Sequence, residues 1–168
     1  MPQTRVTKLD QISTGSIVRM WIKPLIDEEG YPCVTQTTEN DVHLRPDAGE
    51  NDPSQQWIVT VNPSESDRKS FLFKSRKNYK LLGANKNGDL GASLTKHGER
   101  EWFSVAIMPD HKIWGLLISH PREGGPLPFY DVYVKDDTQS LLDATGSGAF
   151  LRKGADYLAQ VQFTLVHD

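Results

Sequence analysis

The stretch LLGANKNGDLGASLTKHGEREWF occupies residues 81–103, and LLDATGSGAFLRKGADYLAQVQF occupies residues 141–163. The two stretches align without a gap at an offset of 60 residues, with five identities in 23 positions. The identical residues are two leucines, an alanine, a turn glycine and a final phenylalanine. A repeat of this kind indicates that the chain is built from copies of one supersecondary unit.

Short apolar runs recur along the whole chain, and none of them keeps the 3.6-residue period of a helix. The runs are bounded by Gly, Pro, Asn, Asp and Ser, which is typical of strands joined by turns. The pair Asn87-Gly88, between two such runs, is a strong signal for a β-hairpin. We expect thirteen strands, at residues 16–23, 31–36, 41–45, 56–61, 70–75, 79–84, 89–93, 102–108, 112–119, 129–136, 140–144, 149–153 and 161–166.

Twelve of these strands group into three similar units of four, each ending in a strand that begins near an aromatic residue. One unit cannot cover its own apolar face, so three units should pack against one another. This arrangement resembles the β-trefoil, a closed six-stranded barrel capped by three hairpins. We therefore predict an all-β chain folded as a single trefoil domain over residues 1–168, with repeats at about 16–63, 64–109 and 110–168. A β-sandwich is the alternative, because the strand spacing also suits it.

The third unit departs from this pattern, because residues 120–139 are extra relative to the second unit. We interpret them as an inserted loop, and loops of that length in compact domains are usually functional or disordered. A competing register makes residues 129–136 the first strand of the third unit and residues 112–119 the insertion.

The overall charge and the apolar runs limit the classes of partner. The 168-residue chain has a net charge of −3, which argues against a nucleic-acid partner. No stretch approaches the roughly 18 apolar residues of a membrane helix, so we expect no membrane insertion. The N-terminal stretch lacks the apolar core of a signal peptide. We therefore expect a cytoplasmic protein, or one exported by a non-classical route.

Residues suited to catalysis or metal binding are few. Cys33, the single cysteine, lies in an apolar strand, so it is interpreted as a small core residue and cannot form an intrachain disulfide. The five histidines lack the spacing of metal ligands, and there is no C-x-x-C pair. The sequence therefore predicts a protein that is not an enzyme and has no metal or other cofactor.

A basic segment lies around residues 68–80, where cationic and aromatic side chains alternate. Its basic residues are Arg68, Lys69, Lys74, Arg76, Lys77 and Lys80, and its aromatic residues are Phe71, Phe73 and Tyr79. Such a pattern can bind single-stranded nucleic acid or a sulfated glycan. In a strand–turn–strand the aromatic rings would instead face the core while the basic side chains face water, and this interpretation is favoured.

The triplet Gln55-Gln56-Trp57 is the most specific local motif. It is similar to the Q-x-W motif that ends each repeat of ricin-B-type lectins, in which the tryptophan packs in the trefoil core. A sugar site in that family combines an aspartate, an aromatic ring that stacks on the sugar, and a polar residue near the motif. Carboxylate and amide groups bond sugar hydroxyls, while a ring covers the apolar face of the sugar.

The third unit matches this sugar site best. The resemblance implies Asp143 as the carboxylate, Phe150 or Tyr157 as the stacking ring, and Gln160 as the polar residue. The first two units depart from the pattern, since Thr35 and Gly83 stand at the aspartate position, and Gln162 replaces the motif tryptophan in the third. The leading hypothesis is a non-catalytic, carbohydrate-binding lectin whose partner is a glycan or a glycoprotein.

A second resemblance is to fungal β-trefoil protease inhibitors of the clitocypin and macrocypin kind, which insert long, proline-bearing loops into protease clefts. Residues 23–32 and 120–130 have such a composition. Proline lowers the entropic cost of ordering a loop in a cleft. This resemblance implies a protease as the partner and contacts from Pro126, Pro128, Phe129 and Tyr130. A fascin-like trefoil that binds another protein is the third hypothesis.

Overall fold

The structure is a computed structural model that describes residues 3–23, 32–38, 40–61, 70–84, 90–94, 102–107, 114–119, 129–135, 140–143, 157–158 and 160–167. The described elements are antiparallel strands with two short 3-10 turns, so the all-β prediction is confirmed. The strands are β1 (Gln3–Arg5), β2 (Ile17–Lys23), β3 (Cys33–Gln36), β4 (Val42–Arg45), β5 (Trp57–Val61), β6 (Phe71–Ser75), β7 (Leu81–Ala84), β8 (Leu90–Leu94), β9 (Phe103–Ile107), β10 (Trp114–Ser119), β11 (Phe129–Lys135), β12 (Ser140–Asp143), β13 (Tyr157–Leu158) and β14 (Gln160–Val166). The 3-10 turns are η1 (Leu9–Gln11) and η2 (Pro53–Gln55).

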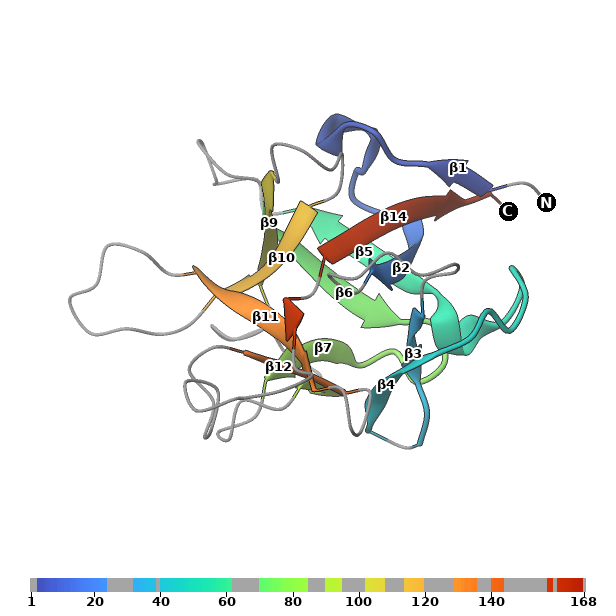
Figure 1. Cartoon of the computed structure of the whole chain (residues 1–168). Helices are drawn as coiled ribbons and strands as arrows, with labels where there is room; N and C mark the ends of the chain where they lie inside the picture. Colours follow the sequence, from blue (N-terminus) through green and yellow to red (C-terminus); the bar gives the residue numbers. More distant parts are fainter. Residues whose placement is uncertain are drawn as a thin grey trace.

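Six strands form a cycle of hydrogen-bonded neighbours in the order β2, β5, β6, β9, β10, β14 and back to β2. Figure 1 shows these strands crossing one another around the centre of the molecule. The pairing of β6 with β9 is the shortest described in this cycle, with Phe71 opposite Phe103.

Alternating apolar residues of the cyclic strands form the core. Val18, Met20 and Ile22 on β2 are fully buried, and their partners on β14 are Leu165, Phe163 and Val161. Alternation of this kind directs every second side chain to the same face of a sheet. The register is comparable where β5 pairs with β6, which places Val59 opposite Phe73.

Phenylalanines from three separate strands meet in this core. The ring centroid of Phe73 on β6 lies 5.5 Å from that of Phe103 on β9 and 5.9 Å from that of Phe163 on β14. All three side chains are fully buried. Burying a large apolar side chain contributes roughly 1.5–3 kcal/mol, so this contact joins the three segments of the chain energetically.

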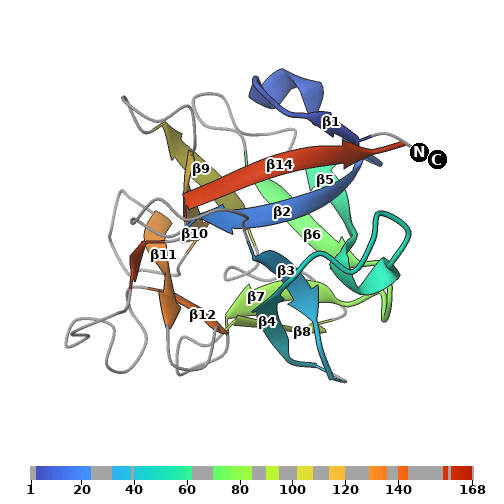
Figure 2. The same ribbon diagram turned by 45° about the vertical axis from the view of Figure 1, so that its right-hand side comes forward.

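Three hairpins lie beside the cyclic strands: β3 with β4, β7 with β8, and β11 with β12. Figure 2 shows most of these hairpin strands gathered below β2, β14 and β5. The hairpins also contact one another, because Ser140 of β12 pairs with His43 of β4, and Asp41 bridges to Gly91 of β8. The turn Asn87-Gly88 lies outside the described residues, although the two strands that flank it pair as the motif predicts.

The third unit agrees in part with the register in which residues 112–119 are its first strand. Residues 112–119 and 129–136 were both expected to be strands and were alternatives for this first position, which β10 takes by pairing with β9 and β14, while β11 also forms and pairs with β10. The interpretation of residues 120–139 as a loop is therefore wrong for residues 129–135. These residues make strand β11, which pairs with β10, β12 and β13.

The repeat of Leu81-Leu82 at Leu141-Leu142 does not relate strands in equivalent places. Leu81 and Leu82 lie in β7, which directly follows β6 and pairs with it and with β8. Leu141 and Leu142 lie in β12, the second strand of its hairpin, which pairs with β11 and β4. The two leucine pairs therefore look alike in sequence although their strands have different partners.

Strands β1 and β13 and both 3-10 turns were not expected from the sequence. Strand β1 pairs with β14, with Gln3 opposite Val166, and this brings the two described ends of the chain side by side. The expected strand at residues 149–153 lies outside the described residues.

Candidate functional site: the Q-x-W motif and the buried arginine

The residues of the predicted sugar site lie around β11 and at the start of β14. Asp143 of β12 pairs with Val132 of β11, and Tyr157 of β13 pairs with Val134 of the same strand. The backbones of Asp143 and Tyr157 therefore flank β11. Gln160 begins β14, where its backbone lies between β10 and β2. Phe150 lies outside the described residues.

The residues of the predicted inhibitory loop are divided between a strand and the segment before it. Phe129 and Tyr130 begin β11 and pair with Ser119 and Ile118 of β10. Pro126 and Pro128 lie outside the described residues. The nine residues 120–128 thus connect two strand ends that face each other across the sheet.

The Q-x-W motif forms the junction between η2 and β5. Asp52 caps this short turn by accepting hydrogen bonds from the backbone nitrogen and the hydroxyl of Ser54, at 2.9 and 2.7 Å. The side chain of Trp57 is fully buried, and its Nε1 donates to the backbone oxygen of Val34 at 3.1 Å. The expectation that Trp57 packs in the core is confirmed.

The aromatic residues that end the second and third units differ in how deeply they are buried. Phe163, which ends the third unit, is fully buried. Trp102, which ends the second unit, is only partly buried and precedes β9. The neighbouring Phe103 takes the buried position instead, because β9 begins there and its side chain faces the phenylalanine cluster.

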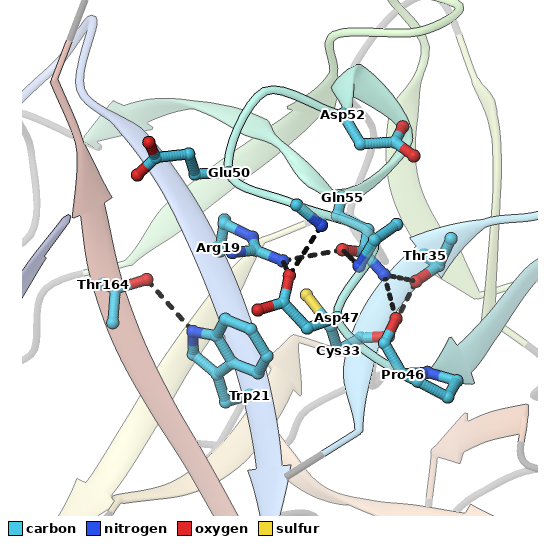
Figure 3. A network of polar contacts seen from close by, with 12 residues as sticks. Arg19, Trp21, Cys33, Thr35, Pro46, Asp47, Glu50, Asp52, Gln55 and Thr164 are labelled. Atoms are coloured by element: carbon cyan, nitrogen blue, oxygen red, sulfur yellow. Dashed lines mark hydrogen bonds and ion pairs between the residues drawn. The ribbon is translucent and has the colours of Figure 1, made fainter. Parts of the chain in front are cut away.

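Gln55, the first residue of the motif, is the centre of a buried hydrogen-bond network (Figure 3). Its Oε1 accepts from Arg19 Nη2 at 2.7 Å and from the backbone nitrogen of Ala48 at 3.0 Å. Its Nε2 donates to Thr35 Oγ1 at 3.0 Å and to the backbone oxygen of Pro46 at 2.8 Å. The amide of Gln55 therefore attaches the loop at residues 46–52 to strands β2 and β3.

Arg19 lies on β2 between two core residues, Val18 and Met20, and its side chain is fully buried. Strand alternation directs it away from the core, and the 46–52 loop covers it on the other side. Nη2 also pairs with Oδ1 of Asp47, and the guanidinium carbon lies 4.3 Å from the centre of the Trp21 ring. Within the described part of the chain, Nε and Nη1 of Arg19 have no hydrogen-bond partner.

Burial of a guanidinium costs free energy that its partners must offset. Asp47, Gln55 and the ring of Trp21 share this role, and the ring is itself fixed because Trp21 Nε1 donates to Thr164 Oγ1 at 3.0 Å. Cation–π contact with tryptophan contributes about 0.5–2 kcal/mol, depending on how dry the site is. The network is thus built to hold one positive charge beneath a surface loop.

Two ionisable groups beside Arg19 have shifted pKa values. The hydrogen bond from Arg19 holds the pKa of Asp47 below its ordinary value, and the backbone nitrogen of Gly49 adds to the effect. Burial raises the pKa of the Cys33 thiol to about 12, although the Arg19 charge opposes the increase. At neutral pH Asp47 is therefore a carboxylate, while Cys33 is a protonated, unreactive thiol.

Arg19 was not recognised as a functional or structural centre from the sequence. Its alternating position in SIVRMWIK is also that of an ordinary solvent-facing arginine. The loop that covers it begins 27 residues later in the chain, at Pro46. The Q-x-W motif was the available signal, because Gln55 is the residue that joins loop and strand.

Two of the three aromatic rings of the basic segment are buried, as the sequence predicted, and the third is exposed. Phe71 and Phe73 are fully buried, which confirms the interpretation of a strand with its rings in the core. Tyr79 is different, because its side chain is 63% exposed and its backbone has a φ of 60°. Arg68 and Lys69 lie outside the described residues.

Among the described residues, no group of three or more His, Cys, Asp or Glu side chains is placed to hold a metal ion. The same part of the chain contains no helix that is both long and apolar enough to cross a membrane. A scan against protein-family models and a search of curated proteins found no match for this chain.

Proposed function

We propose that the protein is a non-catalytic carbohydrate-binding protein built on a β-trefoil. The observation that carries this proposal is the Q-x-W motif, whose Trp57 is buried and whose Gln55 anchors a surface loop. In the ricin-B-type lectins that the motif resembles, the tryptophan has the same core position.

The pairing of the strands supports the trefoil part of the proposal. Six strands pair in a cycle, and three hairpins lie beside them, which is the number of each that a trefoil contains. Each of the three expected units is joined to the next by one pair of strands in this cycle. Met20, Phe73 and Leu116 lie opposite Phe163, Val59 and Val105 in the three junctions between successive units.

The proposed sugar site lies in the third unit and uses Asp143, Phe150, Tyr157 and Gln160. The placement of Asp143 and Tyr157 on strands that flank β11 supports it, because a carboxylate and a ring must come from nearby strands to contact one sugar. The raised pKa of Cys33 argues only against this thiol as a nucleophile, since a protonated buried thiol reacts slowly.

A glycan array tests this proposal when the full chain is applied beside an Asp143→Ala variant. We expect binding to a restricted set of glycans, and we expect Asp143→Ala to lose it while the thermal midpoint changes little. The matched control is Asp10→Ala, at an exposed carboxylate in η1. Loss of folding in Asp143→Ala, or equal glycan binding by both variants, contradicts the site.

Inhibition of a protease is the second candidate function. The observation in its favour is that residues 120–128 lie between Ser119 and Phe129, which pair with each other in the sheet. Proline content and two ends fixed to one sheet both lower the entropy that a segment loses when it enters a cleft. Assays against papain-like, trypsin-like and pepsin-like proteases test it, and nanomolar inhibition without glycan binding would favour it over the lectin proposal.

A further inference from the structure

The turn between β6 and β7 concentrates positive charge on an acidic protein. The segment KSRKNYK at residues 74–80 contains four basic residues and no acidic residue, whereas the whole chain has a net charge of −3. Lys74 and Lys77 are exposed, and Arg76 and Lys80 are partly exposed. This segment, residues 74–80, is called the basic turn below.

An exposed aromatic residue lies in the basic turn in an unfavourable backbone conformation. The φ of Tyr79 is 60°, which is in the left-handed region that bulky residues avoid. Its side chain is 63% exposed, so burial in the core does not compensate for this strain. Asn or Gly would adopt the same backbone at less cost, and strained residues of this kind are concentrated at functional sites.

Hydrogen bonds on both sides of Tyr79 hold the basic turn in place. The backbone nitrogen of Tyr79 donates to the oxygen of Ser75 at 2.8 Å, and the nitrogen of Ser75 donates to the oxygen of Lys80 at 3.0 Å. The side chain of Asn78 accepts from the Lys80 nitrogen at 2.9 Å and donates to the oxygen of Ala92 on β8 at 3.0 Å. The ring of Tyr79 is therefore presented to solvent by a fixed backbone.

Two basic side chains of the basic turn donate hydrogen bonds to other parts of the chain. Arg76 Nη1 donates to Gln56 Oε1 at 2.8 Å, which links the basic turn to the Q-x-W motif. Lys80 Nζ donates to Asn40 Oδ1 at 3.4 Å. The charge of Lys77 also reaches Asp52 in front of η2, whose pKa is lowered chiefly by hydrogen bonds from Ser54 and in part by this lysine.

We propose that the basic turn binds an anionic glycan, with the Tyr79 ring stacked on a sugar face and Lys74, Arg76 and Lys77 paired with its sulfate or carboxylate groups. An aromatic face suits the C–H face of a sugar, and ammonium and guanidinium groups suit anions. This site is separate from the sugar site proposed in the third unit and does not depend on it.

A single-stranded nucleic acid fits the basic turn less well. Proteins that bind such strands stack successive bases on several exposed rings. Here the neighbouring rings of Phe71 and Phe73 are buried, which leaves Tyr79 as the ring of this segment that a ligand can reach.

The experiment uses the full chain with a sulfated polysaccharide such as heparin as the probe. Uncharged dextran, a carboxylated but unsulfated polysaccharide and oligo-deoxythymidine serve as comparison ligands. Affinity is measured over a series of salt concentrations. We expect heparin to bind, dextran not to bind, and the affinity to fall with added salt because the charges are exposed. The carboxylated polysaccharide shows whether sulfate is required or any anionic sugar suffices.

Three variants test the residues. The double variant Lys74→Glu/Lys77→Glu should weaken heparin binding by tenfold or more, because it removes two cations that pair with sulfate. A tenfold change corresponds to about 1.4 kcal/mol of binding free energy. The control Arg5→Glu/Lys8→Glu makes the same change in net charge at exposed residues near β1, which Figure 2 places across the molecule from β7. Tyr79→Asn should weaken heparin binding about as much as the double charge reversal does, because it removes the stacking ring. The thermal midpoint of Tyr79→Asn should equal or exceed that of the parent protein, since asparagine adopts a left-handed backbone with less strain. Tyr79→Phe keeps the ring and should retain binding.

Several outcomes would overturn the proposal. If Arg5→Glu/Lys8→Glu weakened heparin binding as much as Lys74→Glu/Lys77→Glu, binding would not be localised to the basic turn. Unchanged binding by Tyr79→Asn would remove the ring from the site, and a lower midpoint in that variant would make Tyr79 a structural residue. Tighter binding of oligo-deoxythymidine than of heparin would replace the glycan with nucleic acid. Because Asp143→Ala leaves the basic turn intact, heparin binding by that variant separates this proposal from the lectin site.

Discussion

Gln55 Oε1 accepts a hydrogen bond from Arg19 Nη2 at 2.7 Å, although the two residues lie 36 positions apart in the chain. Both side chains are fully buried. The bond connects the first residue of the Q-x-W motif to a strand of the cyclic sheet, so the motif has a structural role besides the burial of its tryptophan. The same amide holds the backbone of the 46–52 loop.

Replacement of Gln55 by Ala should lower the free energy of unfolding by about 3 kcal/mol, because Arg19 and two loop backbone groups would lose buried partners. Urea unfolding measures this change. Gln11→Ala is the control, since the Gln11 side chain also accepts backbone hydrogen bonds but is exposed. We expect a cost of about 1 kcal/mol or less for the control. Equal costs for the two variants would contradict the importance of burial.

Asp47 should make stability dependent on pH in the acidic range. Its pKa in the folded protein is lowered by the hydrogen bond from Arg19, so folding favours the carboxylate. The stabilisation is therefore complete well above the ordinary pKa of about 4 and is lost as the pH falls through the lower, folded value. Because the side chain is 57% exposed, solvent screening limits the effect. Unfolding measured from neutral to acidic pH should show a shallower decline in Asp47→Asn, and an unchanged profile would contradict this assignment.

Gly91 is required where β8 meets the turn before β4. A Cβ at this position would lie 2.7 Å from the backbone oxygen of Asn40, which cannot move aside without breaking its hydrogen bond from Ala92. We expect Gly91→Ala to destabilise the protein by about 1–3 kcal/mol in thermal or urea unfolding. Gly49→Ala is the comparison, since nothing lies within 4 Å of an added Cβ there and only its positive φ is strained. A smaller cost at Gly91 than at Gly49 would argue against this close contact.

Cys33 should resist thiol reagents in the folded protein. Burial raises its pKa to about 12, and the thiolate is the reactive form. A colorimetric thiol reagent at mildly alkaline pH should therefore react slowly with the native chain and rapidly in denaturing urea. Rapid reaction of the native chain would show that the strand containing Cys33 opens readily.

Residues 120–128 should be dispensable for folding, whereas residues 120–139 should not. Ser119 and Phe129 are paired, so an Asn-Gly turn can join them directly. Removing residues 120–139 also removes β11 and its pairing with three strands. Circular dichroism and thermal unfolding should show a folded short-turn variant and an unfolded longer deletion. If the second candidate function is right, the short-turn variant loses protease inhibition, and a folded longer deletion would contradict the role of β11.

The sequence by itself determined the elements whose formation depends on nearby residues. Alternating apolar residues in SIVRMWIK and QQWIVTV predicted β2 and β5, because strand side chains alternate between two faces. The likeness of Leu81-Leu82 to Leu141-Leu142 correctly placed a strand at each pair. It did not reveal which strand of a hairpin each pair belongs to, since any short buried strand before a turn can have that pattern.

Only the tertiary structure decided which strands are neighbours and what covers Arg19. The local pattern predicted a strand at residues 129–136, but it did not show that β10, β12 and β13 would supply the hydrogen-bond partners of β11. Arg19 is buried because Asp47 and Gln55, on a distant part of the chain, close over an outward-facing position. Local alternation determines the face to which a side chain points, and the contacts between distant segments determine whether that face meets water.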